Sequence, residues 1–468
     1  MASAGAERAN MGFISLIVAV ATIGGFMFGY DSGVINGTQD GLRAAFHLND
    51  VWLGVAVAAL LPGCAAGAFL AGRLADLFGR RAVMMSAALI FVASAVAAGA
   101  ADSAVLFIAA RFIAGLAVGA ASVISPIYIS EVTPAAIRGR LSSVQQVMII
   151  AGLTGAFLAN YWLAHTAGES TAIWHGYPAW RWMFWAQVVP AGIYFLALLL
   201  IPESPRYLML KDRDADAGTV LTKLFGATYA ADKVREIRDS LAADHHRPRF
   251  SDLIDSKTGK LRTIVWAGIG IAVFQQLVGI NIVFYYGAVL WKSVGYSEDM
   301  ALQINILSGS ISIVACLIAI FTIDIIGRKP LLLIGSAGMA VTLGIMAYCF
   351  STASMVDGSL HMSDGIGKLA LYSANIYAFA FNLSWGPVMW VMLGEMFPNQ
   401  IRGSGLAVSG LAQWVANFAI SVSFPALAAG VGLPITYGFY AASALVSFFF
   451  VKAMVNETKG RELEDMVG

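Results

Sequence analysis

The sequence predicts an all-α membrane protein with twelve transmembrane helices in two homologous six-helix bundles. Three observations lead to this fold class. Hydrophobic residues make up 59% of the 468 residues and charged residues only 12%, against about 25% charged in a typical soluble domain. The mean hydropathy is +0.74, and many uncharged runs approach the ~20 apolar residues that span a bilayer as a helix. Finally, three charged motifs occur twice, once in each half of the chain.

The duplicated motifs keep the same order in both halves. The pairs are 72–81 (GRLADLFGRR) with 324–329 (DIIGRK), 131–139 with 395–403, and 202–206 (PESPR) with 456–461 (NETKGR). In the second pair, a glutamate, a proline and an Arg-Gly dipeptide recur at identical spacing. Three motifs repeated in one order indicate two homologous halves.

Twelve membrane spans are expected from the apolar runs. The segment 82–101 is the plainest, because it holds no ionisable group. The first span is too long for a cleaved signal peptide and lacks a small-residue cleavage site. The expected spans are 12–38, 51–71, 82–101, 104–130, 140–163, 180–201, 262–292, 300–322, 330–350, 367–394, 401–425 and 432–454.

The polar segments divide the chain into four parts. We expect an N-terminal bundle at 1–202, a cytoplasmic linker with short helices at 203–261, a C-terminal bundle at 262–455 and a cytoplasmic tail at 456–468. The linker alternates charge at helical spacing. With both termini in the cytoplasm, all but five of the 29 Lys and Arg residues lie inside, as the positive-inside rule expects. We therefore expect a multi-pass protein of the cell (inner) membrane.

Several classes of function have no support in the sequence. The three cysteines are isolated in apolar spans and the six histidines lie in predicted loops, so neither a disulfide framework nor a metal site is expected. No nucleophile–base pair or cofactor motif indicates an enzyme, and a net charge of +1 gives no reason to expect nucleic-acid binding. Proton chemistry at membrane depth must therefore use carboxylates.

Asp31 and Arg111 are the charged pair that the spans bury. Each lies about seven residues from the outer end of its span, which at ~1.5 Å per residue places both roughly 10–12 Å below the outer surface. Burial raises the pKa of an unpaired carboxyl group, and a nearby arginine lowers it. An ion pair that opens and closes with conformation would therefore take up and release a proton. The alternative is a permanent salt bridge between the first and fourth spans.

Neutral amides and aromatic rings gather mainly in the second half. The residues are Gln146, Gln275, Gln276, Asn281, Tyr285, Tyr286, Trp390, Gln413, Trp414 and Asn417. Amides supply both donors and acceptors for hydroxyl groups, and indole faces suit apolar ring surfaces, so the set suits a neutral polyhydroxyl ligand. The alternative is hydrogen bonding between helices. Gln275 and Asn281 converge only on a distorted helix, and Gly279 between them permits the distortion.

The duplicated motifs predict a cytoplasmic gate of ion pairs between helix ends, which closes the cytoplasmic face and breaks when it opens. The expected pairs are Asp76 with Arg80 and Arg81, Glu131 with Arg138, and Glu395 with Arg402. The alternative is that the basic residues only set the orientation. The candidate gate residues are Arg73, Asp76, Arg80, Arg81, Glu131, Arg138, Glu203, Asp324, Arg328, Glu395, Arg402 and Glu457.

Five motifs together resemble the sugar porter family of the major facilitator superfamily. They are GRLADLFGRR, PESPRYL, QQLVGIN, GPVMW and NETKGR. The resemblance covers essentially the whole chain and extends, through FGYDSGVING, to the branch that includes the bacterial xylose–proton symporter and related glucose transporters. It implies the major facilitator fold, with alternating access by two bundles and a monosaccharide bound between them. The partners implied are a monosaccharide, a proton and the lipid bilayer, with the protein working as a monomer.

The resemblance also assigns roles to single residues. Asp31 matches the proton-coupling carboxylate and Arg111 its arginine partner. Facilitative glucose carriers of the family have Asn at the Asp31 position, so this Asp favours symport. The implied sugar contacts are Phe28, Gln146, Gln275, Gln276, Asn281, Tyr285, Gly386, Trp390, Gln413 and Trp414.

Three departures from the family pattern bear on specificity. Ser312 stands where relatives often carry a sugar-contacting Asn. Leu153 and Phe284 stand where the xylose symporter has Gln and Leu, whereas glucose carriers tend to have an apolar residue and Phe. We therefore expect a proton-coupled symporter for a hexose such as D-glucose, with D-xylose as the second choice. The alternatives are a facilitative uniporter with a structural Asp31–Arg111 pair, and a sugar sensor that retains the transporter fold.

Overall fold

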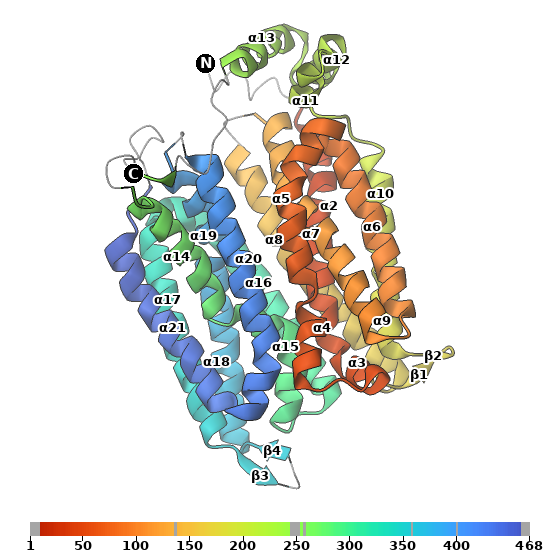
Figure 1. Cartoon of the computed structure of the whole chain (residues 1–468), viewed down its shortest axis with the longest axis vertical. Helices are drawn as coiled ribbons and strands as arrows, with labels where there is room; N and C mark the ends of the chain where they lie inside the picture. Colours follow the sequence, from red (N-terminus) through yellow and green to blue (C-terminus); the bar gives the residue numbers. More distant parts are fainter. Residues whose placement is uncertain are drawn as a thin grey trace.

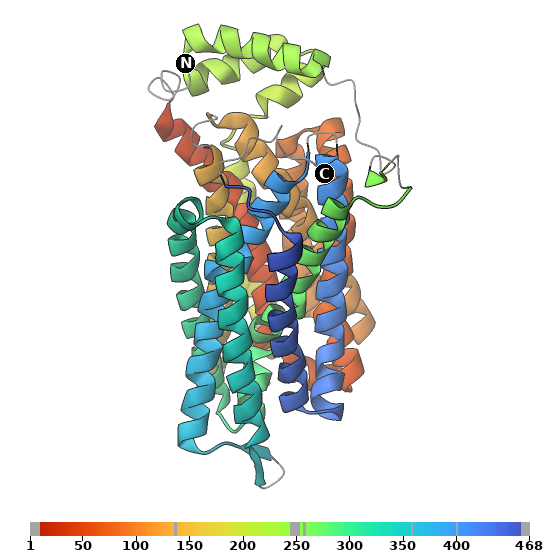
Figure 2. The ribbon, with the colours of Figure 1, turned by 90° about the vertical axis from the view of Figure 1, so that its left-hand side faces the viewer.

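The computed structural model describes residues 10–134, 138–243, 253–255, 259–356, 359–398 and 401–459. The chain there is almost entirely helical, and the two halves of the sequence form two bundles side by side (Figure 1). Short helices that connect the bundles lie beyond one end, and small β-hairpins lie toward the opposite end (Figures 1 and 2). We name these the linker end and the hairpin end.

The elements follow each other in simple order. The first bundle consists of α2 (Met11–Val34), the 3-10 helix η1 (Ile35–Gly37), α3 (Gln39–Phe46), α4 (Asp50–Ala58), α5 (Leu60–Phe78), α6 (Arg80–Ala100), α7 (Ala104–Val132), α8 (Arg138–Ala167), α9 (Ala179–Ala186) and α10 (Val188–Leu198). The linker helices are α11 (Pro205–Leu210), α12 (Asp214–Phe225) and α13 (Ala227–Ala243). The second bundle consists of α14 (Thr263–Leu277), α15 (Ile280–Ser293), α16 (Glu298–Ile326), α17 (Arg328–Ser351), α18 (Asp364–Leu383), α19 (Trp385–Met396), α20 (Arg402–Gly430) and α21 (Leu433–Met454). The antiparallel hairpins are β1 (Ile173–Trp174) with β2 (Tyr177–Pro178), and β3 (Ser354–Val356) with β4 (Ser359–His361).

Eleven helical stretches among the described residues are long and apolar enough to cross a bilayer. They coincide with eleven of the expected spans. The remaining span, expected at 180–201, is formed by α9 and α10, which are divided at Gln187 and are each too short to be counted alone. The predicted fold of twelve spans in two bundles is therefore confirmed.

The first duplicated motif forms the same turn in each bundle. α5 gives way to α6 at Gly79 (φ +103°), and α16 gives way to α17 at Gly327 (φ +101°). A positive φ favours glycine. A Cβ would also lie 2.3 Å from a carboxylate oxygen of Glu203 in the first turn, and 2.8 Å from one of Glu457 in the second. The repeat in the sequence is therefore a repeated backbone turn that is covered by a carboxylate.

Glycines also let the helices of the first bundle approach closely. A Cβ at Gly29 of α2 would lie 1.7 Å from the carbonyl oxygen of Ile149 on α8. A Cβ at Gly115 of α7 would lie 2.1 Å from the carbonyl oxygen of Leu60 on α5. Small residues at helix contacts are typical of membrane bundles, where close packing replaces the hydrophobic driving force.

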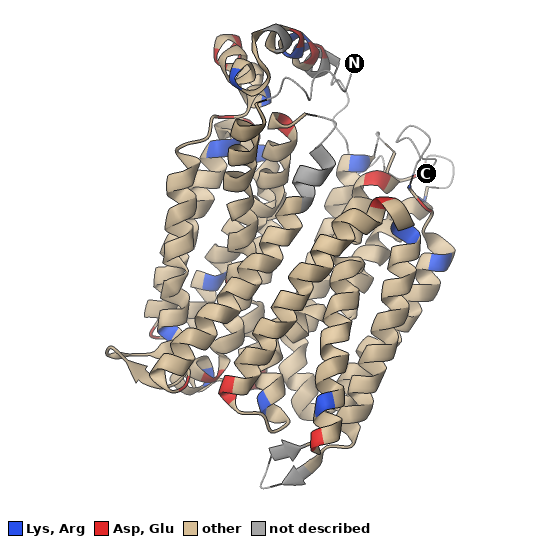
Figure 3. Cartoon of the chain, turned by 180° about the vertical axis from the view of Figure 1, so that it is seen from behind, with Lys and Arg blue, Asp and Glu red and all other residues tan. Residues whose placement is uncertain are grey.

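The linker helices pack on the first bundle. The backbone N–H of Asn10 donates to the carbonyl oxygen of Leu224 on α12 at 2.8 Å. Leu221 and Leu224 join the same buried cluster as Ile14 and Ile17 of α2. Lys, Arg, Asp and Glu lie mainly toward the two ends of the bundles (Figure 3), as the cost of charge in a bilayer requires.

Candidate functional site

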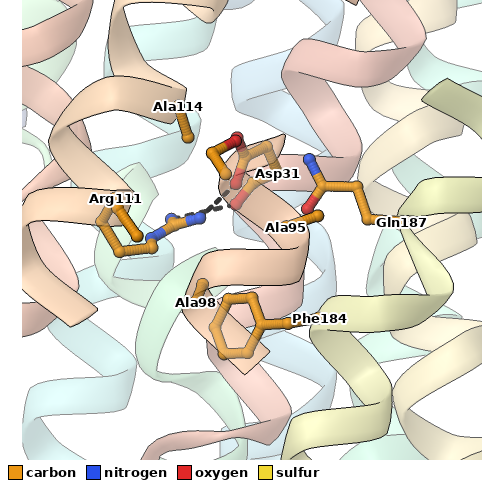
Figure 4. A pocket seen from close by; sticks show the side chains of 9 residues that line it. Asp31, Ala95, Ala98, Arg111, Ala114, Phe184 and Gln187 are labelled. Atoms are coloured by element: carbon orange, nitrogen blue, oxygen red, sulfur yellow. Dashed lines mark hydrogen bonds and ion pairs between the residues drawn. The ribbon is translucent and has the colours of Figure 1, made fainter. Parts of the chain in front are cut away.

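Asp31 and Arg111 form a buried ion pair inside the first bundle. Asp31 lies on α2 and Arg111 on α7, and each residue is 1% exposed. Arg111 Nη1 donates to Asp31 Oδ1, and Nη2 donates to the Asp31 carbonyl oxygen at 3.0 Å (Figure 4). The guanidinium also lies 5.7 Å from the centroid of the Phe184 ring. Arg111 therefore holds both the side chain and the backbone of α2 at this point.

A small pocket surrounds this ion pair. Its lining comes from the first bundle: Asp31, Ser94, Ala95, Ala98, Ala110, Arg111, Ala114, Phe184 and Gln187 (Figure 4). Asp31 Oδ2 has no hydrogen-bond partner among the described residues. Gln187 was missed by the sequence reasoning, although an amide inside an apolar span is by default a functional candidate.

The amides of the second bundle meet at a broken helix. Gly279 separates α14 from α15 with φ +79°. Gln275 Nε2 donates to the carbonyl oxygen of Trp385 at 3.1 Å, and Gln276 Nε2 donates to Gln275 Oε1 at 3.0 Å. Asn281 Nδ2 in turn donates to Gln276 Oε1 at 2.6 Å. The distortion expected at Gly279 is therefore present, and it brings the three amides into one hydrogen-bonded chain.

Aromatic side chains lie around the same region. The Trp414 ring of α20 lies 6.0 Å from the Phe28 ring of α2, centroid to centroid, so the two bundles meet there. Tyr285 is buried, with its phenol beside Asn417 of α20 and Ser32 of α2.

The remaining candidates for the sugar site differ in exposure. Trp390 of α19 is 42% exposed, and Gln146 is partly exposed. Gln413 is buried, and its Oε1 has no hydrogen-bond partner among the described residues. Gly386 follows a second helix break, at Ser384 between α18 and α19. Open donors and acceptors and an exposed indole face are what a polyhydroxyl ligand needs.

Asn36 joins the two bundles toward the hairpin end. It lies on η1, directly after α2. Its Nδ2 donates to the carbonyl oxygen of Phe284 at 2.6 Å, and its Oδ1 accepts from the backbone N–H of Ala288 at 3.1 Å and from Asn305 Nδ2 at 2.9 Å. A Cβ at Gly287 would lie 2.2 Å from Asn305 Oδ1, so glycine makes this close contact possible. We name these contacts the Asn36 latch.

Charged pairs join the bundles at the same end. Lys292 of α15 lies 2.5 Å from Asp40 of α3, measured between Nζ and Oδ2. His165 Nδ1 of α8 lies 2.8 Å from Asp299 Oδ1 of α16. Both pairs are solvent-accessible, so each contributes at most about 1 kcal/mol. The buried hydrogen bonds between the bundles at the hairpin end are therefore those of the Asn36 latch and one from Gln39 Nε2 to the carbonyl oxygen of Tyr285.

The duplicated motifs at the linker end pair within each bundle. Arg80 lies 2.9 Å from Asp76 and 3.0 Å from Glu131, between nitrogen and oxygen atoms. Arg328 repeats the arrangement, at 2.9 Å from Asp324 and 2.8 Å from Glu395. The printed ion pairs of Arg80 and Arg328 thus lie within their own bundles, so in this conformation they brace each bundle.

The third motif caps the helix that follows each turn. Glu203 accepts hydrogen bonds from the backbone N–H groups of Arg80 and Arg81 at 2.9 and 3.1 Å. Glu457 accepts from Arg328 and Lys329 at 3.0 and 2.9 Å. A carboxylate at a helix N-terminus is favoured by the unpaired N–H groups and the helix dipole. Burial opposes ionisation of Glu457, but the backbone N–H groups outweigh it and lower its pKa.

Two of the expected pairs at the linker end are wrong, and a third lies partly outside the described residues. Glu131 pairs with Arg80, because the turn at Gly79 aims Arg80 across to α7; the Arg138 side chain lies outside the described residues. Arg81 donates to the carbonyl oxygen of Leu198 and was wrongly expected to pair with Asp76. Arg402 does not pair with Glu395, because Glu395 binds Arg328. The Nε of Arg402 instead donates to the carbonyl oxygen of Phe397 at 3.2 Å. Arg73 lies 5.9 Å from the ring centroid of Phe69.

Comparison with known proteins places the chain in a family. A family model described as "Sugar (and other) transporter" matches residues 17–467. The chain belongs to this sugar transporter family. It is 46% identical to the "Glucose transport protein" of Synechocystis sp., over 98% of each chain. It is 36% identical to the "D-xylose-proton symporter" of Escherichia coli (strain K12), over 98% of this chain and 96% of the other.

A solved structure is similar over the same extent. It is the xylose transporter XylE from E. coli in an inward open conformation, with a TM-score of 0.83 and 34% identity over 97% of this chain and 99% of that one. Sugar transporters of this family are multi-pass membrane proteins, as the spans of this chain require. No group of three or more His, Cys, Asp or Glu residues that could hold a metal ion occurs in the described part of this transporter.

The three specificity candidates of this sugar transporter lie inside the fold. Leu153 on α8 and Phe284 on α15 are both buried. Ser312 on α16 is engaged within the second bundle: its hydroxyl donates to the carbonyl oxygen of Ser308 at 2.7 Å and accepts from Asn382 Nδ2 at 3.0 Å. Asn382 on α18 was missed, although it too is an amide within an apolar span. The hydroxyl of Ser312 therefore already has partners within the protein.

Proposed function

We propose that this protein is a proton-coupled monosaccharide symporter that imports a neutral sugar by alternating access. The observation that carries the proposal is the buried Asp31–Arg111 pair, in which one carboxylate oxygen is held by arginine and the other has no hydrogen-bond partner among the described residues. Burying a carboxylate this deeply in a membrane span is costly, so such a residue is by default a candidate for function. The free oxygen is a place for a transported proton.

The orientation follows from the charges and from the contacts between the bundles. The linker end carries the basic motifs, so we place it and both termini in the cytoplasm of a cell whose inner membrane holds the protein. The Asn36 latch holds the bundles together at the hairpin end, while the ion pairs of Arg80 and Arg328 at the linker end stay within their own bundles. The arrangement is that of an inward-facing state, adopted by a single chain working as a monomer.

In the proposed cycle, protonation comes before sugar transport. When the hairpin end is open, a proton from outside neutralises Asp31 and weakens its attraction to Arg111. Sugar then binds Gln275, Gln276 and Asn281. Its hydroxyl groups replace the hydrogen bonds that these amides make with each other, and its ring packs against an indole face. The bundles then rock to the inward-facing state, where sugar and proton leave.

The sugar preferred is D-glucose or a similar hexose, with D-xylose possible. Leu153 and Phe284 have the apolar and aromatic character that the glucose carriers of the family show. Ser312 has a short side chain whose O–H and one of its two acceptor lone pairs are already used, so it offers little to a sugar hydroxyl. The 46% identity to a glucose transport protein points the same way.

Replacing Asp31 by asparagine tests the proton-coupling role. In proteoliposomes, an inward gradient of one pH unit can drive about tenfold accumulation if one proton moves with each sugar, because one unit corresponds to 1.36 kcal/mol. We expect Asp31→Asn to abolish this accumulation while sugar exchange at equal pH continues. Asp102→Asn, which changes an exposed carboxylate at the hairpin end, is the matched control.

Two results would contradict the proposal. Uphill accumulation by Asp31→Asn would remove the coupling role from this residue. Wild-type uptake that causes no alkalinisation of a lightly buffered external medium would instead indicate a facilitative uniporter in which the Asp31–Arg111 pair is structural.

A further inference from the structure

Gln187 lies at the junction between α9 and α10 and is 1% exposed. Its side chain extends from the helix toward Asp31, and both residues line the same small pocket (Figure 4). Its Nε2 has no hydrogen-bond partner among the described residues, and the same is true of Asp31 Oδ2. An unused donor and an unused acceptor thus share one buried space, although a buried polar group without a partner is costly.

The other polar groups near Asp31 are mostly engaged elsewhere. Arg111 of α7 uses its two Nη atoms on Oδ1 and the α2 backbone, and its Nε is a second buried donor without a partner among the described residues. Ser94 of α6 donates to the carbonyl oxygen of Phe91 at 3.2 Å. The thiol of Cys64 on α5 and the phenol of Tyr285 on α15 lie close enough to interact electrostatically with the pair, but neither lines the pocket.

The rest of the pocket offers no hydrogen bond from a side chain. It is formed by the ring of Phe184 and by four alanines, which are Ala95, Ala98, Ala110 and Ala114. Tyr30, the neighbour of Asp31 on α2, does not line it either. Gln187 is therefore the only amide in the pocket.

We propose that Gln187 is the third member of the proton site and holds the Asp31 carboxyl group in both of its protonation states. The amide and Oδ2 share the pocket without a hydrogen bond between them in this conformation, and rotation of the Gln187 side chain lets the amide N–H donate to Oδ2 when Asp31 is ionised. When a proton binds Oδ2, the amide rotates and its carbonyl oxygen accepts the new O–H. Because an amide is neutral in both orientations, it satisfies either form without competing with Arg111 for charge.

This role rests on the proposed proton coupling and makes a distinct prediction. Hydrogen bonds to a charged group are roughly twice as strong as neutral ones, so removing the amide destabilises ionised Asp31 more than protonated Asp31. Gln187→Met keeps the length of the side chain and removes its polar atoms. We expect it to move the pH of half-maximal proton-driven uptake by about one unit toward alkaline, an effect of the size of one charge-assisted hydrogen bond. Equal-pH sugar exchange should stay within about twofold.

A second variant keeps the test informative if the methionine side chain disturbs folding. Gln187→Glu preserves size and polarity but adds a carboxyl group beside Asp31. Two carboxyl groups in one site titrate as a coupled pair, so we expect a broader pH profile that also extends toward alkaline pH. Gln145→Met is the matched control, because Gln145 is another buried amide of the first bundle with unpartnered polar atoms but lies outside the Asp31 pocket.

The experiment uses the full-length protein in proteoliposomes, with proton-driven uptake and equal-pH exchange measured across the same pH series. Shifted profiles for both Gln187 variants, with an unshifted Gln145→Met, would support the proposal. Profiles of Gln187→Met and Gln187→Glu that superimpose on the wild type would overturn it and leave Gln187 a packing residue. Failure of proton coupling itself would appear separately, as wild-type uptake with no alkalinisation of the medium.

Discussion

Replacing Asn36 by alanine removes the Asn36 latch and tests whether it closes the hairpin end. The side chain makes three hydrogen bonds to the second bundle, with the backbone of Phe284 and Ala288 and with the side chain of Asn305. A hydrogen bond contributes about 0.5–1.5 kcal/mol net, so three favour the closed hairpin end by about 2–4 kcal/mol. Since 1.4 kcal/mol is a factor of ten, the balance between closed and open should move about 30- to 700-fold toward open.

Spin labels can report this change directly. Ile173 on β1 and Met300 on α16 are exposed at the hairpin end of different bundles, and the distance between labels there should lengthen in Asn36→Ala. External sugar should also bind more tightly, because a larger fraction of the protein is ready to accept it. Asn160→Ala is the control, since Asn160 Nδ2 bonds to the carbonyl oxygen of Val34 within the first bundle at 3.0 Å. Unchanged label distances and sugar affinity in Asn36→Ala would refute the assignment.

Three further predictions concern the sugar site and the linker end. Gly279→Ala places a Cβ on a backbone with φ +79°, 2.6 Å from the Tyr440 ring. Sugar exchange per molecule of folded protein should therefore fall more than tenfold. Normal exchange would show that the helix break is dispensable. Leu153→Gln combined with Phe284→Leu should raise the uptake of D-xylose relative to D-glucose by about two- to tenfold, the worth of one hydrogen bond, as measured by competition with unlabelled sugars. The pKa of Glu457 is lowered in the folded protein. Its ionised form therefore stabilises the fold above the pKa of about 4.3 in the unfolded chain, and this contribution is lost as pH falls through the lowered pKa. The difference in Tm between the wild type and Glu457→Gln should therefore shrink from about pH 6 to about pH 3, and a difference that does not depend on pH would count against this prediction.

Much of the fold could be predicted because a bilayer leaves few choices. Backbone groups in hydrocarbon must be paired within a helix, so apolar runs of sufficient length locate the spans. The convergence of Gln275 and Asn281 was also predictable, since six residues face apart on a regular helix and only Gly279 offers a break. The division of the sixth span at Gln187 was not expected. The run 180–201 is apolar apart from Arg181 and Gln187, and its signal for the junction of α9 and α10 is Pro190, which lacks the N–H that a continuous helix would bond to the carbonyl oxygen of Ala186.

Partners at the ends of helices were harder to predict than the helices. The expected pair of Glu131 with Arg138 stays untested, because the Arg138 side chain lies outside the described residues, and the Gly79 turn brings Arg80 to Glu131 from another helix, which the sequence did not suggest. Asn36 is an amide within the expected span 12–38, but its partners gave no sequence signal, because two of the three hydrogen bonds go to backbone atoms of α15. Backbone partners leave no trace in residue type, so contacts of this kind are visible only once the bundles are placed.

The two bundles have the same turns at the linker end, but their buried polar residues differ. Helix α2 connects the charged pair of the first bundle to the amide-rich region of the second. The Asp31 carboxylate lies in the first bundle, where Arg111 also grips the α2 backbone through the Asp31 carbonyl oxygen. Five residues further on, Asn36 holds α15, the helix that carries Asn281 and Tyr285. We infer that neutralising Asp31 loosens the contact between α2 and α7, and that this contact fixes the position of Asn36. A proton bound in the first bundle can then change how firmly Asn36 holds α15, the helix that carries the proposed sugar contacts Asn281 and Tyr285, in the second bundle.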